Sequence, residues 1–244
     1  MILQACLNGA RRPDEHMALP LSAKALAVDA HGAVHAGANE LHLHVRDAAG
    51  KETLDSVAVG INLHAVRTAV PGTLIGISTG AWIEGDQEQT LKCIASWRGL
   101  PDYASVNFCE RAAPFLADML RKRGVGVEAG LASVADAERL LALGIGPLAM
   151  RILIELDDET TFAAAKTTTD RILEVLAKAP WRKPLLLHGF NATVWPVLEH
   201  AIRLGFSVRV GLEDGLKMPD GSIAKNNADL VAAAAQIMRS IRKA

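Results

Sequence analysis

The chain has 244 residues, of which 50% are hydrophobic, and a formal net charge of −1. This near-neutral balance argues against a nucleic acid or an anionic membrane surface as a partner. No signal-peptide pattern or bilayer-length apolar run is found, and the odd number of cysteines shows no Cys-x-x-Cys spacing, so we expect a soluble, cytoplasmic protein with reduced thiols and no membrane segment.

Short apolar runs alternate with amphipathic segments along the chain. The runs with strand-like composition are Ile2–Leu7, Glu40–Val45, Thr73–Ser78, Tyr103–Asn107, Gly126–Glu128, Ala149–Ile154, Pro184–His188 and Ser207–Val210. The helix-like segments are Ser22–Ala36, Ser56–Ala69, Gln87–Trp97, Ala113–Arg123, Ser133–Leu143, Thr160–Ala179, Ala192–Leu204 and Asn226–Arg242. Strand–helix alternation is typical of a parallel sheet that is buried on both faces.

Eight strand–helix units in a chain of this length predict a single (β/α)8 TIM barrel that spans residues 1–244. The alternative is an open, doubly wound sheet, which a Gly-x-Gly-x-x-Gly turn after the first strand would favour. The first predicted strand is instead followed by Asn8-Gly9-Ala10-Arg11, and no Gly-Lys-Ser/Thr phosphate loop occurs. The closed barrel is therefore the favoured fold.

The most informative motif is His42-Leu43-His44 at the end of the second predicted strand. Side chains two residues apart on a strand point to the same face, so both imidazoles project together. Two imidazoles aimed at one point are half of a zinc-type metal site. The alternative is a pair of histidines satisfied by neighbours in a packed interior, but two adjacent buried imidazoles need partners, which favours the metal.

Polar residues also end the other predicted strands, where a TIM barrel carries its active site. They are Asn8, Ser78-Thr79-Gly80, Ser105 and Asn107, Glu128, Glu155, His188, and Arg209 to Asp214. Strand eight closes beside strand one, so Glu213 can complete a His–His–carboxylate set, although alone it would be a solvated loop acid. Arg209 and Asp214 could similarly form an ion pair of little consequence, or a base held in its ionised state.

The chain resembles the β-keto acid cleavage enzymes, of which the 3-keto-5-aminohexanoate cleavage enzyme is the best-known type. The resemblance rests on Leu7–Arg11, on Ala36–Ala38 followed by Leu41–Asp47, on Ile77–Gly80 and on Arg209–Asp214, in the same order along the chain. It implies a zinc-dependent TIM barrel that transfers a fragment between a β-keto acid and acetyl-CoA, giving acetoacetate and a new acyl-CoA.

The resemblance also implies roles for individual residues. His42, His44 and Glu213 would hold the zinc, and Arg209 with Asp214 would form the dyad that takes a proton from the substrate carbon. The residues around the substrate would be Ser78 and Ser105 near its carboxylate, Thr79, Gly80 and Asn107 lining the pocket, and Glu128 among the polar groups. A zinc ion with an open position suits this chemistry, because breaking a bond beside a ketone builds negative charge on the oxygen.

Two positions depart from the family pattern. Arg11 stands where members that cleave amino-substituted acids carry an acidic residue, so we expect a substrate with a neutral or anionic distal end and Arg11 as a carboxylate clamp. Glu155-Leu156-Asp157-Asp158-Glu159 replaces an expected glycine-rich turn, which leaves the handling of coenzyme A and the roles of Glu155 and His188 open.

Other functions fit parts of the sequence. One is a different metal-dependent barrel, either an aldolase-type C–C lyase or a hydrolase, although hydrolytic amidohydrolase barrels carry His-x-His after the first strand. Another is a barrel without catalysis that binds metal or a small acid. The alanine-rich helices, such as the segment Val231–Ala235, also suggest a homo-oligomer of undefined size.

Overall fold

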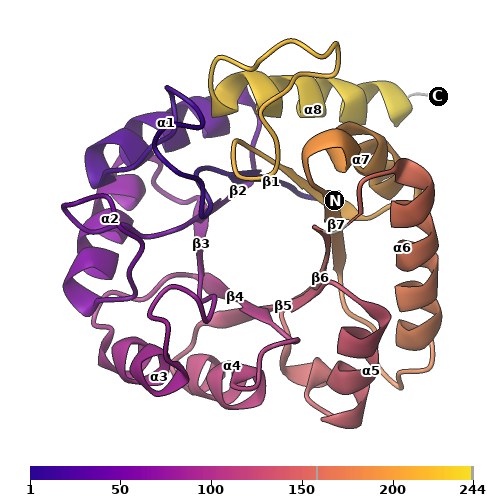
Figure 1. The fold of residues 1–244 in the computed structure, drawn as a ribbon, viewed down its shortest axis with the longest axis horizontal. Helices are drawn as coiled ribbons and strands as arrows, with labels where there is room; N and C mark the ends of the chain where they lie inside the picture. The colour runs from indigo at the N-terminus through magenta and orange to yellow at the C-terminus, as the bar shows by residue number, and fades with distance from the viewer. Residues whose placement is uncertain (158, 243–244) are drawn as a thin grey trace.

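The computed structural model, which describes residues 1–157 and 159–242, has eight parallel strands closed into a barrel and eight helices around it (Figure 1). The strands are β1 Leu3–Cys6, β2 Glu40–Leu43, β3 Leu74–Ser78, β4 Tyr103–Asn107, β5 Gly126–Leu131, β6 Arg151–Leu156, β7 Leu185–Gly189 and β8 Ser207–Val210. The helices are α1 Ala23–Ala36, α2 Ser56–Ala69, α3 Gln87–Ser96, α4 Ala113–Lys122, α5 Val134–Ala142, α6 Phe162–Leu176, α7 Val194–Arg203 and α8 Asn227–Ile241. The TIM barrel predicted from the sequence is confirmed. Asp158, in the acidic segment noted above, lies outside the described residues.

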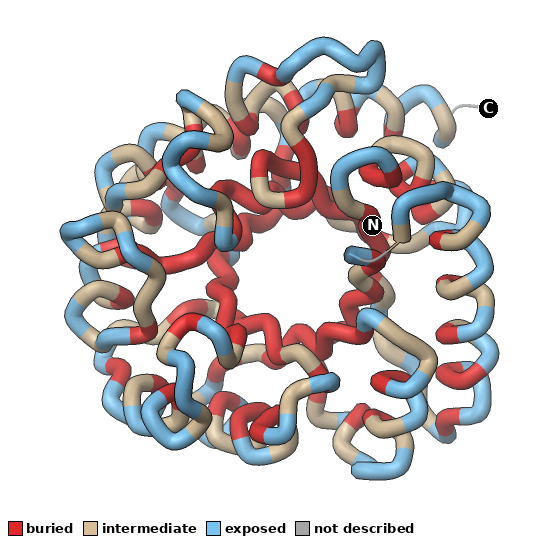
Figure 2. The backbone as a smooth tube through the Cα atoms, in the orientation of Figure 1, coloured by how far each residue is buried: buried red, intermediate tan, exposed pale blue. Residues whose placement is uncertain are grey.

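Each helix buries one face against the sheet and exposes the other, so red (buried) and pale blue (exposed) stretches alternate along the outer ring of helices in Figure 2. Helix α2 illustrates the pattern, since Val59, Leu63 and Val66 are buried and recur at helical spacing. Its start is set by Asp55, whose carboxylate accepts hydrogen bonds from two backbone N–H groups of the first turn. Among the described residues, no helix is long and apolar enough to cross a membrane.

A polar cluster fills the barrel interior. Arg151 on β6 donates to Glu128 Oε1 on β5 at 2.5 Å, and its Nη1 lies 2.6 Å from Glu40 Oε2 on β2. The Nε2 of Gln4 donates to the Tyr103 hydroxyl at 2.8 Å and to Glu128 Oε1 at 3.2 Å. All five side chains are buried, so the charges are satisfied by one another rather than by water.

Two strands continue beyond their predicted ends, and this changes where two acidic residues lie. The predicted fifth strand ends at Glu128, whereas β5 continues to Leu131, so Glu128 lies within the strand. Strand β6 likewise continues to Leu156 and includes Glu155. Both predictions ended the strand before or at a charge, but Glu128 is paired with Arg151 on the neighbouring strand β6 and is tolerated in the interior.

Candidate metal centre and active site

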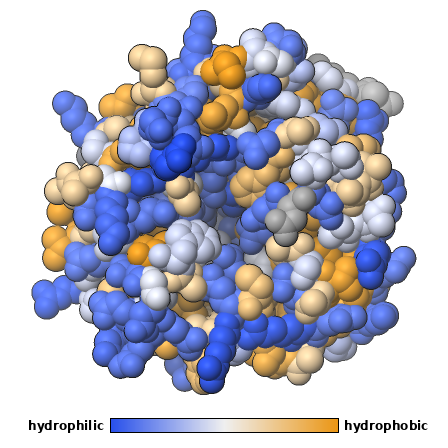
Figure 3. All heavy atoms as spheres, in the orientation of Figure 1, coloured by the Kyte–Doolittle hydropathy of each residue, from blue (hydrophilic) through white to orange (hydrophobic). Residues whose placement is uncertain are grey.

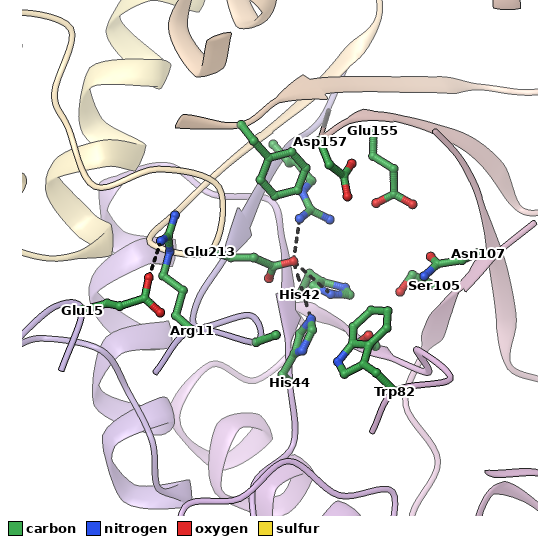
Figure 4. Close-up of a pocket in the computed structure, with 14 residues that line it drawn as sticks. Arg11, Glu15, His42, His44, Trp82, Ser105, Asn107, Glu155, Asp157 and Glu213 are labelled. Atoms are coloured by element: carbon green, nitrogen blue, oxygen red, sulfur yellow. Dashed lines mark hydrogen bonds and ion pairs between the residues drawn. The ribbon is translucent and has the colours of Figure 1, made fainter. Parts of the chain in front are cut away.

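The three predicted metal ligands meet at the carboxyl end of the barrel (Figure 4). His42 lies on β2, His44 directly follows that strand, and Glu213 lies in the loop after β8. Oε1 of Glu213 is 3.8 Å from Nε2 of His42 and 3.6 Å from Nε2 of His44. Because zinc–ligand bonds are about 2.0–2.2 Å long, donors around one ion lie roughly 3–4 Å apart. The three side chains therefore form a candidate site for one cation.

The loop after β1 holds this arrangement in place. The side chain of Asn8 accepts a hydrogen bond from the backbone N–H of His44 at 2.8 Å and donates to the carbonyl of His44 at 2.9 Å. Gly9 has a φ of +56°, and a Cβ at this position would lie 2.5 Å from Cγ of Glu213. A glycine is needed here because it permits both the left-handed backbone and the close approach of Glu213.

Glu52 contacts the site from outside, and the sequence reasoning missed it. Its Oε1 lies 2.5 Å from Nδ1 of His44, so the ring presents Nε2 toward Glu213. A carboxylate that holds the far nitrogen of a histidine in this way is the usual partner of a metal-binding imidazole. Glu52 is placed by an antiparallel bridge with Arg46 in the loop between β2 and α2. No sequence motif around Glu52 predicts its contact with His44.

The protonation preferences of the three ligands fit a cation site. Burial alone would raise the pKa of Glu213, but Arg209, His42 and His44 hold it well below its usual range. Burial lowers the pKa of His42 to about 4, which leaves the imidazole neutral and able to bind a metal. Burial would also lower the pKa of His44, but Glu213 and Glu52 raise it to about 9, so cation binding there releases a proton.

Arg209 and Asp214 form a buried pair beside these ligands. Arg209 donates to Oδ1 of Asp214 at 3.1 Å through Nε and at 2.7 Å through Nη2, and it also donates to Oε1 of Glu213 at 2.6 Å. Oδ2 of Asp214 has no hydrogen-bond partner within the described part of the chain. Burial raises the pKa of Asp214 to about 7, although Arg209 opposes the shift. A carboxylate with a pKa near neutrality can accept a proton and release it again.

A pocket of about 340 Å³ opens beside the three ligands, at the hollow in the middle of the face seen in Figure 3. Its lining is Ala10, Arg11, Glu15, His42, His44, Ser78, Trp82, Ser105, Asn107, Glu155, Asp157, Phe190, Arg209 and Glu213. The lining includes four of the predicted substrate-binding residues, Arg11, Ser78, Ser105 and Asn107. It also includes Glu15, Trp82 and Phe190, which sequence reasoning did not single out.

Four predicted site residues lie outside this lining: Thr79, Gly80, Glu128 and Asp214, the last of which is fully buried against Arg209. Thr79 is buried, and its hydroxyl donates to the carbonyl of Ser105 at 2.6 Å, so it supports the wall from behind. Gly80 lies against the ring of Trp82, where a Cβ would approach within 2.2 Å. Glu128 is fully buried and paired with Arg151, so the expectation that it sits among the polar groups of the pocket is corrected.

Arg11 lines the pocket but its charge is already balanced. Its Nη1 lies 3.0 Å from Oε2 of Glu15, its Nη2 donates to Asn191 at 3.3 Å, and its Nε donates to the carbonyl of Leu212. The side chain is only 15% exposed. Arg11 is therefore held in one orientation at the edge of the pocket, with an acid beside it.

The fold and the site together define the class of this protein as a TIM barrel with a candidate His–His–carboxylate metal site at the carboxyl end of its strands. Residues 1–244 match the beta-keto acid cleavage enzyme family, and the chain belongs to that family. It is 26% identical to the 3-keto-5-aminohexanoate cleavage enzyme of Acetoanaerobium sticklandii, over 95% of this chain and 89% of the relative. It is 28% identical to the enzyme of the same name from Fusobacterium nucleatum, over 95% of this chain and 88% of the relative.

Solved structures of similar fold support the architecture. The apo structure of ObcA superposes with a TM-score of 0.75 at 17% identity, over 93% of this chain. The match covers 62% of the ObcA chain, so this protein spans less than two thirds of ObcA. The type I 3-dehydroquinate dehydratase of Clostridium difficile superposes with a TM-score of 0.66 at 13% identity, over 98% of this chain and 92% of the dehydratase. At these identities the likeness concerns the fold alone.

Proposed function

We propose that this protein is a zinc-dependent enzyme that cleaves a β-keto acid with acetyl-CoA as co-substrate. The acyl part of the keto acid would be transferred to coenzyme A, and the remaining two-carbon acid would join the acetyl group to give acetoacetate. The observation that carries this proposal is the meeting of His42, His44 and Glu213 at an open pocket, in a chain that belongs to the β-keto acid cleavage family.

The donor set fits zinc. Two imidazole nitrogens and one carboxylate oxygen are a usual ligand set for catalytic zinc, with the fourth position left for water or a substrate oxygen. The second oxygen of Glu213 and Nδ1 of His42 have no hydrogen-bond partner within the described residues, while the facing atoms of the three side chains converge. When bound, zinc would polarise the ketone of the substrate as a Lewis acid.

Asp214 is the residue suited to remove the proton from the substrate carbon. That proton lies between a ketone and a carboxylate and is already acidic, so a carboxylate of modest basicity is sufficient. Arg209 holds Oδ1 of Asp214 through two hydrogen bonds and leaves Oδ2 without a partner in the described structure. In this proposal Oδ2 accepts the proton, and Arg209 keeps the carboxylate oriented before and after the transfer.

The opposite walls of the pocket would fix the two ends of the substrate. Ser78 and Ser105 are adjacent across β3 and β4, and their hydroxyls are suited to the carboxylate of the keto acid. Arg11 and Glu15 lie at another edge, where they would meet the distal end. We expect that end to be neutral or anionic, and steady-state rates on amine-tailed and carboxylate-tailed β-keto acids test this. A clear preference for the amine would contradict it.

The experiment that tests the function is a substrate screen. Purified protein loaded with zinc is incubated with acetyl-CoA and each member of a panel of β-keto acids, and new acyl-CoA and acetoacetate are measured by mass spectrometry. We expect both products with at least one acid, and none with the Glu213→Gln variant. Bound zinc without turnover across the panel would favour a barrel that only binds metal or a small acid. Turnover that needs no acetyl-CoA would indicate another C–C lyase or a hydrolase.

A further inference from the structure

Glu155 is an acidic residue of the pocket that the proposed reaction does not use. It lies on β6, across the pocket from the three metal ligands, and Figure 4 shows its carboxyl group on the same side as Asn107 and Ser105. Its position depends on Gly130 of β5, because a Cβ there would lie 2.4 Å from Oε1 of Glu155. The missing side chain of Gly130 thus makes a cradle that the carboxyl group of Glu155 fills.

A second oxygen faces the same cradle. Oδ1 of Asn107 would lie 3.1 Å from the Cβ built at Gly130. The orientation of this amide is set by Glu110, whose Oε1 accepts a hydrogen bond from Nδ2 of Asn107 at 3.2 Å. Both oxygens border the space left by the missing side chain of Gly130, and because an amide oxygen is only an acceptor, it offers an ionised Glu155 no hydrogen bond.

The charged and titratable groups around Glu155 do not offer it a strong cationic partner. Nε2 of His188 on β7 lies 3.9 Å from Oε2, beyond hydrogen-bond distance, and burial holds the pKa of His188 well below its usual range, so the ring is neutral. Burial raises the pKa of Glu155 to about 8. Arg209 on β8 opposes this shift, and three acids, Asp157 after β6, Glu128 on β5 and Glu213 after β8, add to it.

We propose that Glu155 works as a neutral carboxylic acid and donates a hydrogen bond to the carboxylate of the bound keto acid, beside the hydroxyl of Ser105. An ionised Glu155 would repel that carboxylate, whereas a protonated one binds it. The inference deepens the proposed function and rests on it. It assigns Glu155 as a binding residue for anionic acids and gives a reason for the departure from the family pattern at this strand.

The test is the pH dependence of binding, which can be separated from turnover. The probe is acetoacetate, titrated by calorimetry into zinc-loaded protein without acetyl-CoA. The Kd should rise about tenfold over the two pH units centred on the pKa of Glu155, which is about 8 before zinc binds. Glu155→Gln keeps a neutral donor of similar shape. Its Kd should therefore change by less than about twofold over the pH range in which the Kd of the wild type rises about tenfold.

Two further variants make the outcome decisive. Glu155→Ala should bind acetoacetate about five- to tenfold more weakly than the wild type at pH 7, because the donor is lost. Glu138→Gln, on the exposed side of α5, is the matched control and should follow the wild type at every pH. Circular dichroism confirms that each variant is folded. If Glu155→Gln and the wild type show parallel pH profiles, this inference is overturned while the proposed function stands. If zinc-loaded wild type does not bind acetoacetate at all, both are overturned.

Discussion

The contact between Glu52 and His44 makes a quantitative prediction about metal affinity. The two side chains are 15% and 5% exposed, and the oxygen and nitrogen are 2.5 Å apart, so this is a largely desolvated, charge-assisted hydrogen bond. Glu52→Gln keeps the shape of the side chain and the backbone bridge to Arg46 but removes the charge. His44 then loses the carboxylate that orients its ring toward Glu213.

The expected cost follows from this geometry. Removing an outer partner of a metal-binding histidine typically weakens metal binding by about 10- to 100-fold, which is about 1.4 to 2.7 kcal/mol. Because the pair is short and buried, we expect a loss within this range and not the negligible effect of a surface pair. Zinc affinity is measured by competition with a fluorescent chelator, on protein stripped of metal and then shown to be folded by circular dichroism.

A surface carboxylate provides the control. Glu88 on α3 is 76% exposed and forms a surface ion pair with Lys92 on the same helix, so Glu88→Gln should leave zinc affinity unchanged. The reasoning is refuted if Glu52→Gln binds zinc within twofold of the wild type. It is also refuted if the control loses as much affinity as Glu52→Gln, because the effect would then not depend on His44.

Three further predictions concern other buried charges. Asp214→Asn should lower kcat about 10²- to 10⁴-fold with unchanged zinc content, whereas a loss below tenfold would remove Asp214 as the base. Arg151→Met leaves two buried carboxylates unpaired and should cost about 3 to 5 kcal/mol in urea denaturation, and a cost under about 1 kcal/mol would contradict this. Burial raises the pKa of Asp29 from 3.8 to about 6, so its contribution to stability is complete below pH 3.8 and is lost as the pH rises through 6. Asp29→Asn should therefore stabilise the protein by up to about 3 kcal/mol at pH 7.5 and not at pH 3.5, and equal effects at both would refute the assignment.

Much of the site could be predicted because its main residues follow strands whose order was readable. The His-x-His motif predicts that both imidazoles point the same way, since alternate residues of a strand share a face. Glu213 could be added because a closed barrel brings the end of β8 near β2 across β1, and the observed pairing of β1 with both strands confirms this. Periodicity and topology were sufficient for these three ligands.

The errors arose where a contact between residues distant in the sequence overrides the local pattern. Glu128 interrupts an apolar run, so the predicted strand ended there, but its partner Arg151 lies on the next strand and keeps it inside. The contact of Glu52 with His44 could not be predicted either, because it depends on a bridge within the loop and no sequence motif marks it. Thr79 is next to Ser78 in the chain yet turns its hydroxyl to a backbone carbonyl of β4.

The central claim is that one divalent cation is held jointly by His42, His44 and Glu213. The most direct test is the zinc-to-protein ratio, determined by elemental analysis after equilibration with zinc and removal of the loosely bound ion. We predict a ratio of about one for the wild type and a ratio near zero for both His42→Ala and Glu213→Gln, with all three proteins folded. Equal zinc content in the wild type and these two variants, or no bound zinc in any of them, would contradict the account.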